Sequence, residues 1–257
     1  MCLILFSWKE TPGHDLVLLA NRDEFLARPT RQADFWEDHP DILGGRDLEE
    51  GGSWLAVGTN RRMAAVTNVR EPGRTVRDPI SRGHLVTAFL TSMDSARHFA
   101  RATRDQGDRY NGFNLLLYDG KELVFVSNRS TENVRVLPPG LYGLSNADLD
   151  TPWPKVESGK EDLERVLSGN PGWSLTDLMP ILMDTTKAPD ADLPRTGVPL
   201  EWERILSARC IRSPEYATRS SSIVLVTTDG GVTFRERTHQ PNPHDVTFEL
   251  IPCQQRP

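Results

Sequence analysis

The chain is predicted to fold as an α+β protein in which two largely antiparallel sheets are covered by layers of helices. Strand-like segments are joined mostly by short turns, which is typical of antiparallel pairing. Helical segments occur in blocks between groups of strands, an order that excludes Rossmann and barrel folds. Because no repeat or clear linker divides the 257 residues, we expect one domain over residues 1–257.

The first part of the chain is expected to supply mainly strands. An apolar strand over Cys2–Trp8, a turn over 11–13 and a second apolar strand over 15–20 predict an N-terminal hairpin. The polar stretch 28–52, in which two glycine pairs bracket acidic residues, is expected to be mostly loop. Two further strands are predicted over 53–58 and 63–68.

Helices and strands then follow in groups. Ser81 is expected to cap a helix that ends near residue 92, Asp94 or Ser95 to start one that ends near residue 107, and Ser174 to cap one that ends near residue 184. Asp-Gly dipeptides at 119–120 and 229–230 each predict a hairpin. The other expected helices are 155–167 and 201–208, and the expected strands are 114–118, 122–127, 133–137, 141–145, 221–228, 232–237 and 247–251.

The composition describes a globular protein, with 37% apolar and 26% charged residues and a formal net charge of -6. This acidic balance argues against a nucleic-acid partner. No apolar run is long enough for a membrane span, and the apolar start is too short for a signal peptide. Three widely spaced cysteines fit a reducing compartment, so a cytoplasmic location is expected. The six histidines lack metal-binding spacing, so no metal site is expected.

Cys2 has the most specific chemical implication in the chain. Removal of the initiator methionine would give Cys2 both a thiol and a free α-amine, whose ordinary pKa values are about 8.5 and 7.7–8.0. The amine could then accept the proton of the attacking thiol. Two alternatives stay open. A cysteine in an apolar strand is often an inert buried residue, and retention of Met1 would block the amine.

Four polar residues, Asn21, Arg22, Asp23 and Glu24, follow the second predicted strand. Because such groups cannot be buried cheaply without partners, we expect them at the sheet rim or around a cavity. Strand alternation places Arg22 and Glu24 on the face opposite Asp23, either as a salt-bridge pair or as a contact to a ligand head group. Four arginines suit phosphate or carboxylate binding, or else belong to a solvated loop: Arg70, Arg74, Arg77 and Arg82.

Several motifs, in this order, resemble the NRDE-motif family, also called the transport and Golgi organisation proteins. The resemblance covers most of the chain. It is carried by Met1-Cys2, Ala20-Asn21-Arg22-Asp23-Glu24-Phe25, Arg28-Pro29, Gly51-Gly52-Ser53-Trp54-Leu55, Ala65-Val66-Thr67-Asn68, Tyr142-Gly143-Leu144-Ser145-Asn146, Thr151-Pro152-Trp153 and Thr218-Arg219-Ser220-Ser221. That family is in turn similar to the N-terminal-nucleophile hydrolases, especially the bile-salt hydrolases and penicillin V acylases.

The resemblance implies a four-layer αββα sandwich and a set of catalytic residues. In these hydrolases the N-terminal Cys is the nucleophile, which implies that role for Cys2. It further implies that Asp23 orients the amine of Cys2, that Asn68 and Asn146 support the oxyanion and the amine, and that Arg219 lies close to the nucleophile. From the residues alone, Asn68 and Asn146 fit turn or cap positions equally well.

One position departs from the acylase pattern. The acylases carry an arginine three residues before the aspartate, where this chain has Ala20. The neighbouring Arg22 is not expected to inherit that role, because in a strand it would face away from Asp23.

Two functions remain open at this stage, with a scaffold that binds no small ligand as a third. One is an N-terminal cysteine hydrolase that cleaves an amide or thioester of an acyl or lipid-like substrate. The other, implied by the family resemblance, is a carrier in haem trafficking or in acyl-CoA and lipid metabolism. No resident cofactor is expected, although haem is a candidate ligand. The sequence leaves the oligomeric state open.

Overall fold

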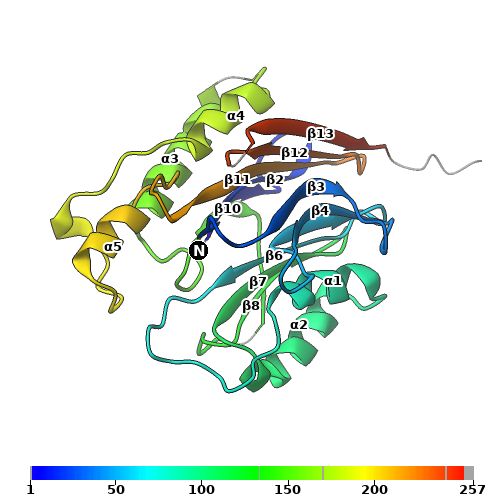
Figure 1. Cartoon of the computed structure of the whole chain (residues 1–257). Coiled ribbons are helices and arrows are strands. Elements are labelled where there is room, and N and C mark those ends of the chain that lie inside the picture. The colour runs from blue at the N-terminus through cyan, green and yellow to red at the C-terminus, as the bar shows by residue number, and fades with distance from the viewer. Residues whose placement is uncertain (1, 133, 170, 241, 252–257) are drawn as a thin grey trace, which may run out of the picture.

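A computed structural model of the chain describes residues 2–132, 134–169, 171–240 and 242–251 and contains two antiparallel sheets (Figure 1). The six-stranded sheet has the order β10 (Gly140–Leu144), β1 (Cys2–Trp8), β2 (His14–Phe25), β11 (Tyr216–Thr227), β12 (Val232–Thr238) and β13 (His244–Leu250). The seven-stranded sheet runs in chain order through β3 (Thr30–Phe35), β4 (Ile42–Asp47), β5 (Leu55–Gly58), β6 (Met63–Asn68), β7 (Phe113–Tyr118), β8 (Leu123–Ser127) and β9 (Arg135–Val136).

The helices form two outer layers, one on each sheet. On the seven-stranded sheet lie α1 (Gly83–Thr91) and α2 (Ala96–Asp105), and on the six-stranded sheet lie α3 (Pro154–Gly169) and α4 (Leu175–Leu182) (Figure 1). The remaining helical segments are α5 (Leu200–Leu206) and the short 3-10 turns η1 (Gly107–Arg109) and η2 (Asp190–Asp192).

Three apolar clusters separate these four layers. The inner cluster, between the sheets, includes Phe6, Leu18 and Phe234. A second cluster joins the seven-stranded sheet to α1 and α2, and a third joins the six-stranded sheet to α3 and α4. Each sheet therefore buries both of its faces, and the predicted αββα architecture is confirmed.

The stretch 28–52 was predicted to be mostly loop, and that prediction is wrong, because β3 and β4 lie within it. Strand β3 is a mostly exposed edge strand, so its sequence lacks an apolar pattern. In β4, a Cβ on Gly44 would lie 2.7 Å from the Cβ of Ala56, and one on Gly45 would lie 2.2 Å from the Trp54 ring. These glycines mark close packing inside a sheet rather than a turn.

The other segments match more closely, with two corrections. The second strand was predicted to end at residue 20, before the polar tetrapeptide. Instead, β2 continues through the tetrapeptide to Phe25. Ser81 does not cap α1, which begins at Gly83 with no side-chain cap, whereas Ser95 accepts a hydrogen bond from the backbone N–H of His98 and caps α2. Residue 133, the predicted start of a strand, lies outside the described residues.

None of the helices in the described part of the chain combines the length and apolar character needed to cross a bilayer.

We predict that Leu18→Ala lowers the free energy of unfolding by about 2–5 kcal/mol, because Leu18 is fully buried between the sheets and truncation leaves a cavity. Urea denaturation measures this loss. The control is Met93→Ala, which removes an apolar side chain that is 96% exposed and should change stability little. Equal losses in both variants would contradict the assignment of the inner core.

Candidate functional site

Cys2 is the first residue of β1 and lies opposite Arg22 in the antiparallel pairing with β2. On β1, Ile4 belongs to the inner core between the sheets, whereas Leu3 belongs to the cluster under α3 and α4. Since side chains alternate along a strand, Cys2 and Arg22 share the inter-sheet face. Asp23 belongs to the opposite face, next to the helices.

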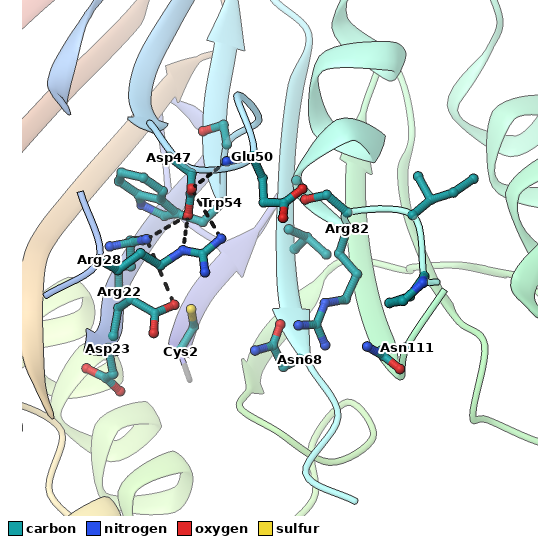
Figure 2. Close-up of a pocket in the computed structure, with 17 residues that line it drawn as sticks. Cys2, Arg22, Asp23, Arg28, Asp47, Glu50, Trp54, Asn68, Arg82 and Asn111 are labelled. Atoms are coloured by element: carbon teal, nitrogen blue, oxygen red, sulfur yellow. Dashed lines mark hydrogen bonds and ion pairs between the residues drawn. The ribbon is translucent and has the colours of Figure 1, made fainter. Parts of the chain in front are cut away.

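The Cys2 side chain opens into a cleft of about 260 Å³ (Figure 2). Charged side chains are frequent around it, and Asn68 faces Cys2 from the end of β6. The lining residues are Cys2, Arg22, Asp23, Glu24, Arg28, Asp47, Glu50, Ser53, Trp54, Val66, Asn68, Pro79, Ile80, Ser81, Arg82, Gly83 and Asn111.

Asp47 holds two arginines in place at one side of the cleft. Its Oδ2 lies 3.2 Å from Nη2 of Arg22 and 2.5 Å from Nε of Arg28. The Arg22 guanidinium also stacks over the Trp54 ring, 4.3 Å from its centre, and Nη1 donates to Thr30 Oγ1 at 3.0 Å. Arg22, although buried, is therefore fixed by a salt bridge, a ring and a hydroxyl beside the thiol.

The environment of Cys2 has opposing effects on its thiol. Burial raises the pKa of Cys2 above its ordinary value, while the nearby positive charge of Arg22 acts to lower it. Burial is the larger effect, so the thiol is held mainly in its protonated form at neutral pH.

Asp23 and Lys155 are both buried near Cys2, and their charges affect each other. Thr218 Oγ1 donates a 2.6 Å hydrogen bond to Oδ1 of Asp23, and the Tyr216 hydroxyl donates to the Asp23 carbonyl at 2.8 Å. Burial raises the pKa of Asp23, and the charge of Lys155 opposes this. Burial lowers the pKa of Lys155 to about 8, although the charge of Asp23 acts in the opposite direction. The carboxylate and the ammonium thus stabilise each other's charged forms.

Asn146 supports the site by holding the backbone. Its Nδ2 donates to the carbonyl of Asn68 at 2.8 Å, and the neighbouring Ser145 Oγ donates to the carbonyl of Cys2 at 3.0 Å. Asn146 lines a neighbouring cavity rather than the Cys2 cleft. Of the two predicted asparagines, Asn68 therefore lines the cleft and Asn146 fixes its position.

Three other residues predicted to belong to the site do not line the cleft: Asn21, Arg70 and Arg219. Asn21 is buried and donates to the carbonyls of Leu182 and Arg209 at 2.8 and 2.7 Å. Arg70 forms a 2.7 Å ion pair with Glu203, away from the cleft.

Arg219 also lies elsewhere, since its Nη1 donates to the backbone carbonyls of Phe25, Leu26 and Arg28 at 3.0, 3.2 and 2.9 Å. The arginine opposite the thiol is Arg22, which sequence reasoning had set aside because it faces away from Asp23. It does face away from Asp23, but Cys2 lies on the same side as Arg22.

Sequence reasoning missed the places of Asp47 and Arg82 in the cleft lining and the burial of Lys155 next to the site. Asp47 was noted only as part of an acidic stretch, and Arg82 only as one of four loop arginines. Lys155 was treated as the first residue of an amphipathic helix. A lysine on the apolar side of that helix was the available signal, because a buried lysine needs a charged partner.

Two antiparallel sheets between helix layers, with Cys2 opening an interior strand beside a cleft, form the N-terminal-nucleophile-hydrolase-like αββα sandwich expected from the sequence. Solved structures share it. An N-acylethanolamine-hydrolyzing acid amidase ortholog from Caenorhabditis elegans aligns with a TM-score of 0.54 and 12% identity, over 88% of this chain and 92% of that chain. A variant of conjugated bile acid hydrolase from Clostridium perfringens aligns with a TM-score of 0.54 and 8% identity, over 96% and 92%. At these identities the likeness concerns the fold alone.

The chain belongs to the Transport and Golgi organisation 2 family, whose family model matches residues 1–241. The Transport and Golgi organization protein 2 homologs of Bos taurus and Homo sapiens are 42% and 37% identical to it, each over 93% of both chains. The Drosophila melanogaster protein is 30% identical, over 93% of this chain and 92% of its own. The predicted family resemblance is thereby confirmed.

Within the described residues, no group of three or more histidine, cysteine, aspartate or glutamate side chains is arranged to hold a metal ion.

We predict that Asp47→Asn lowers the free energy of unfolding by about 3 kcal/mol at pH 7, because it removes the closer of the two carboxylates that pair with the buried Arg22. Burial acts to raise the pKa of Asp47, but the hydrogen bond from Arg28 and neighbouring charges lower it overall, below 3.8. A carboxylate of this kind stabilises the fold above its unfolded-state pKa, and the stabilisation is lost as the pH falls through the folded-state pKa.

The difference between wild type and Asp47→Asn should therefore shrink below a pH of about 4. Urea titrations from pH 7 to pH 3 measure it. Asp78→Asn is the matched control, because the Asp78 side chain is 94% exposed and should contribute little at any pH. A loss that stays constant across this range would contradict a role for the Asp47 charge.

Proposed function

We propose that this protein is an N-terminal cysteine hydrolase that cleaves an amide or thioester of an acyl or lipid-like substrate. The observation that carries the proposal is the position of Cys2, which opens β1 inside a cleft with Arg22 directly across the strand pair and Asn68 facing it. The fold shared with amide-cleaving enzymes supports the reaction class as an analogy.

The reaction begins with loss of the Cys2 thiol proton to the α-amine of the same residue. Cys2 Sγ then attacks the carbonyl carbon and forms a C–S bond, while negative charge develops on the carbonyl oxygen. The side-chain amide of Asn68 is suited to donate to that oxygen, and a preset donor of this kind contributes about 3 kcal/mol to lowering the barrier.

Collapse of the tetrahedral intermediate breaks the bond to the leaving amine or thiol, which takes the proton from the α-ammonium. A water molecule then attacks the acyl group on Cys2, releasing a carboxylic acid and restoring the thiol. This route requires that Met1 be removed. Met1 lies outside the described residues, so its removal is part of the proposal. Asp23, paired with Lys155, would hold the freed α-ammonium, and Asn146 would keep Asn68 in place.

We predict that purified protein lacks Met1 and gains the mass of one acyl group when incubated with a panel of acyl thioesters and amides. Intact-mass spectrometry detects both changes. Cys2→Ala should form no adduct and lose activity by more than about a thousandfold, because the nucleophile is gone. Cys210→Ala is the control, since Cys210 is a buried cysteine outside the cleft and its loss should leave the adduct intact. Quantitative retention of Met1 would rule out the mechanism.

One observation favours a second candidate, a carrier that performs no reaction. Burial raises the pKa of the Cys2 thiol and so disfavours the nucleophilic thiolate. The ligand would then be haem or an acyl-CoA, bound without covalent attachment. The free thiols of Cys2 and Cys210 fit a cytoplasmic location for either function.

We predict that the Cys2→Ala variant distinguishes a carrier from a hydrolase by whether it still binds ligand. A carrier that does not use the thiol should bind haem or acyl-CoA saturably and retain its affinity in Cys2→Ala, as measured by calorimetry and, for haem, by the Soret band. For the hydrolase, adduct formation disappears in the same variant. If Cys2→Ala stays folded but loses all binding, a thiol-independent carrier is excluded.

A further inference from the structure

Arg82 differs from the other two arginines that line the Cys2 cleft. Arg22 and Arg28 share the carboxylate of Asp47, and Arg28 also pairs with Glu49 at 3.2 Å. Arg82 forms no ion pair with any residue that the structure describes, and its Nη1 donates to the carbonyl of Gly112 at 3.1 Å. The cleft thus contains a guanidinium that forms no salt bridge with a described carboxylate, although Glu24 and Glu71 act on its charge at longer range.

The Arg82 guanidinium faces the reacting end of the cleft. Figure 2 shows it between Asn68 and Asn111, on the side of the cleft across from Arg22 and Arg28. It is partly buried, and desolvation lowers its pKa while the proximity of Cys2 raises it. Holding a partly desolvated cation without a counter-charge costs free energy, which a bound anion would recover.

The acidic residues of the cleft have other contacts. Glu24 accepts a hydrogen bond from the backbone N–H of Phe25 at 2.8 Å and lies 4.0 Å from Arg22. Asp23 belongs to the helix face, and the Glu50 residue is exposed to solvent. No carboxylate of the described residues lies within 4.0 Å of the Arg82 guanidinium. Its N–H groups other than the one that donates to Gly112 therefore remain available to a ligand.

The backbone next to Arg82 is also partly positive, like the guanidinium. Arg82 is the N-cap of α1, and its neighbours Ser81 and Gly83 line the cleft as well. The positive end of the helix dipole therefore lies on the same side as the guanidinium and also favours negative charge.

We propose that Arg82 binds an anionic group of the acyl substrate, a carboxylate or a phosphate, so that the cleft selects acyl compounds with a negative charge close to the carbonyl that Cys2 attacks. The proposal names the substrate class of the proposed hydrolase and rests on that function. The volume of about 260 Å³ fits a compact charged group and the scissile bond rather than a whole large ligand.

Alkylation of Cys2 by two small reagents tests this without turnover. Iodoacetate carries a carboxylate and iodoacetamide is its neutral counterpart, and peptide mapping gives the labelling rate at Cys2 for each. In Arg82→Gln, the ratio of the iodoacetate rate to the iodoacetamide rate should fall about tenfold relative to wild type, the effect expected for loss of one charge-assisted contact. Arg82→Lys, which keeps the positive charge but loses the planar, two-pronged set of guanidinium donors, should give an intermediate ratio.

Arg77→Gln is the matched control, because the Arg77 side chain is 97% exposed and the substitution removes the same charge. Its ratio should equal that of wild type. An unchanged ratio in Arg82→Gln, or an equal slowing of both reagents, would overturn the proposal, since the second result means that Arg82 acts on the thiol and not on an anion. Far-UV circular dichroism checks that each variant is folded.

A second measurement separates the two anion classes. Inorganic phosphate and acetate, at matched ionic strength, are tested for protection of Cys2 against iodoacetamide. Protection by phosphate supports a phosphate-bearing substrate and protection by acetate a carboxylate, provided that Arg82→Gln abolishes it. Lack of protection by both anions would count against the site.

The outcomes also separate this inference from the proposed reaction. An Arg82-dependent preference for iodoacetate without any acyl adduct would leave the anion site standing and remove the hydrolase. An acyl adduct without that preference would keep the hydrolase and remove the anion site.

Discussion

The pairing of β2 with strands on both of its edges is the constraint on which the site depends. Because β1 and β11 satisfy its backbone, the polar side chains at the end of β2 are enclosed and need side-chain or backbone partners. Asn21 reaches the carbonyl of Leu182 at the end of α4, Arg22 reaches Asp47 on β4, and Asp23 reaches Thr218 on β11. One short polar segment thus connects both sheets and a helix layer around the cleft.

Strand alternation divides the chemistry of this segment between two faces. Arg22 and Glu24 share the inter-sheet face with the thiol and line the cleft. Asp23 lies against the helices, near Lys155, where water is excluded. The proposed reaction, which both activates a thiol and orients a charged amine, would benefit from this division, because each task would occur in an environment of different polarity.

Much of the fold was predictable because its strands carry apolar patterns and its hairpins carry Asp-Gly turns. The αββα layers and the family followed from the resemblance. Strand β3 was missed because an exposed edge strand shows no apolar alternation. Within the site, the motif indicated Cys2, Asp23 and Asn68, which line one cleft. Contacts such as Arg22 with Asp47, or Lys155 near Asp23, join residues far apart in the chain, and no local spacing reveals them.

The buried lysine makes the electrostatics of the site sensitive to pH just above neutrality. With a pKa of about 8, Lys155 is mostly charged at pH 7 and about half neutral one unit higher. As that charge is lost, Asp23 has less electrostatic compensation behind the thiol. The field around the site therefore changes gradually over the mildly alkaline range, through a side chain that never touches bulk water.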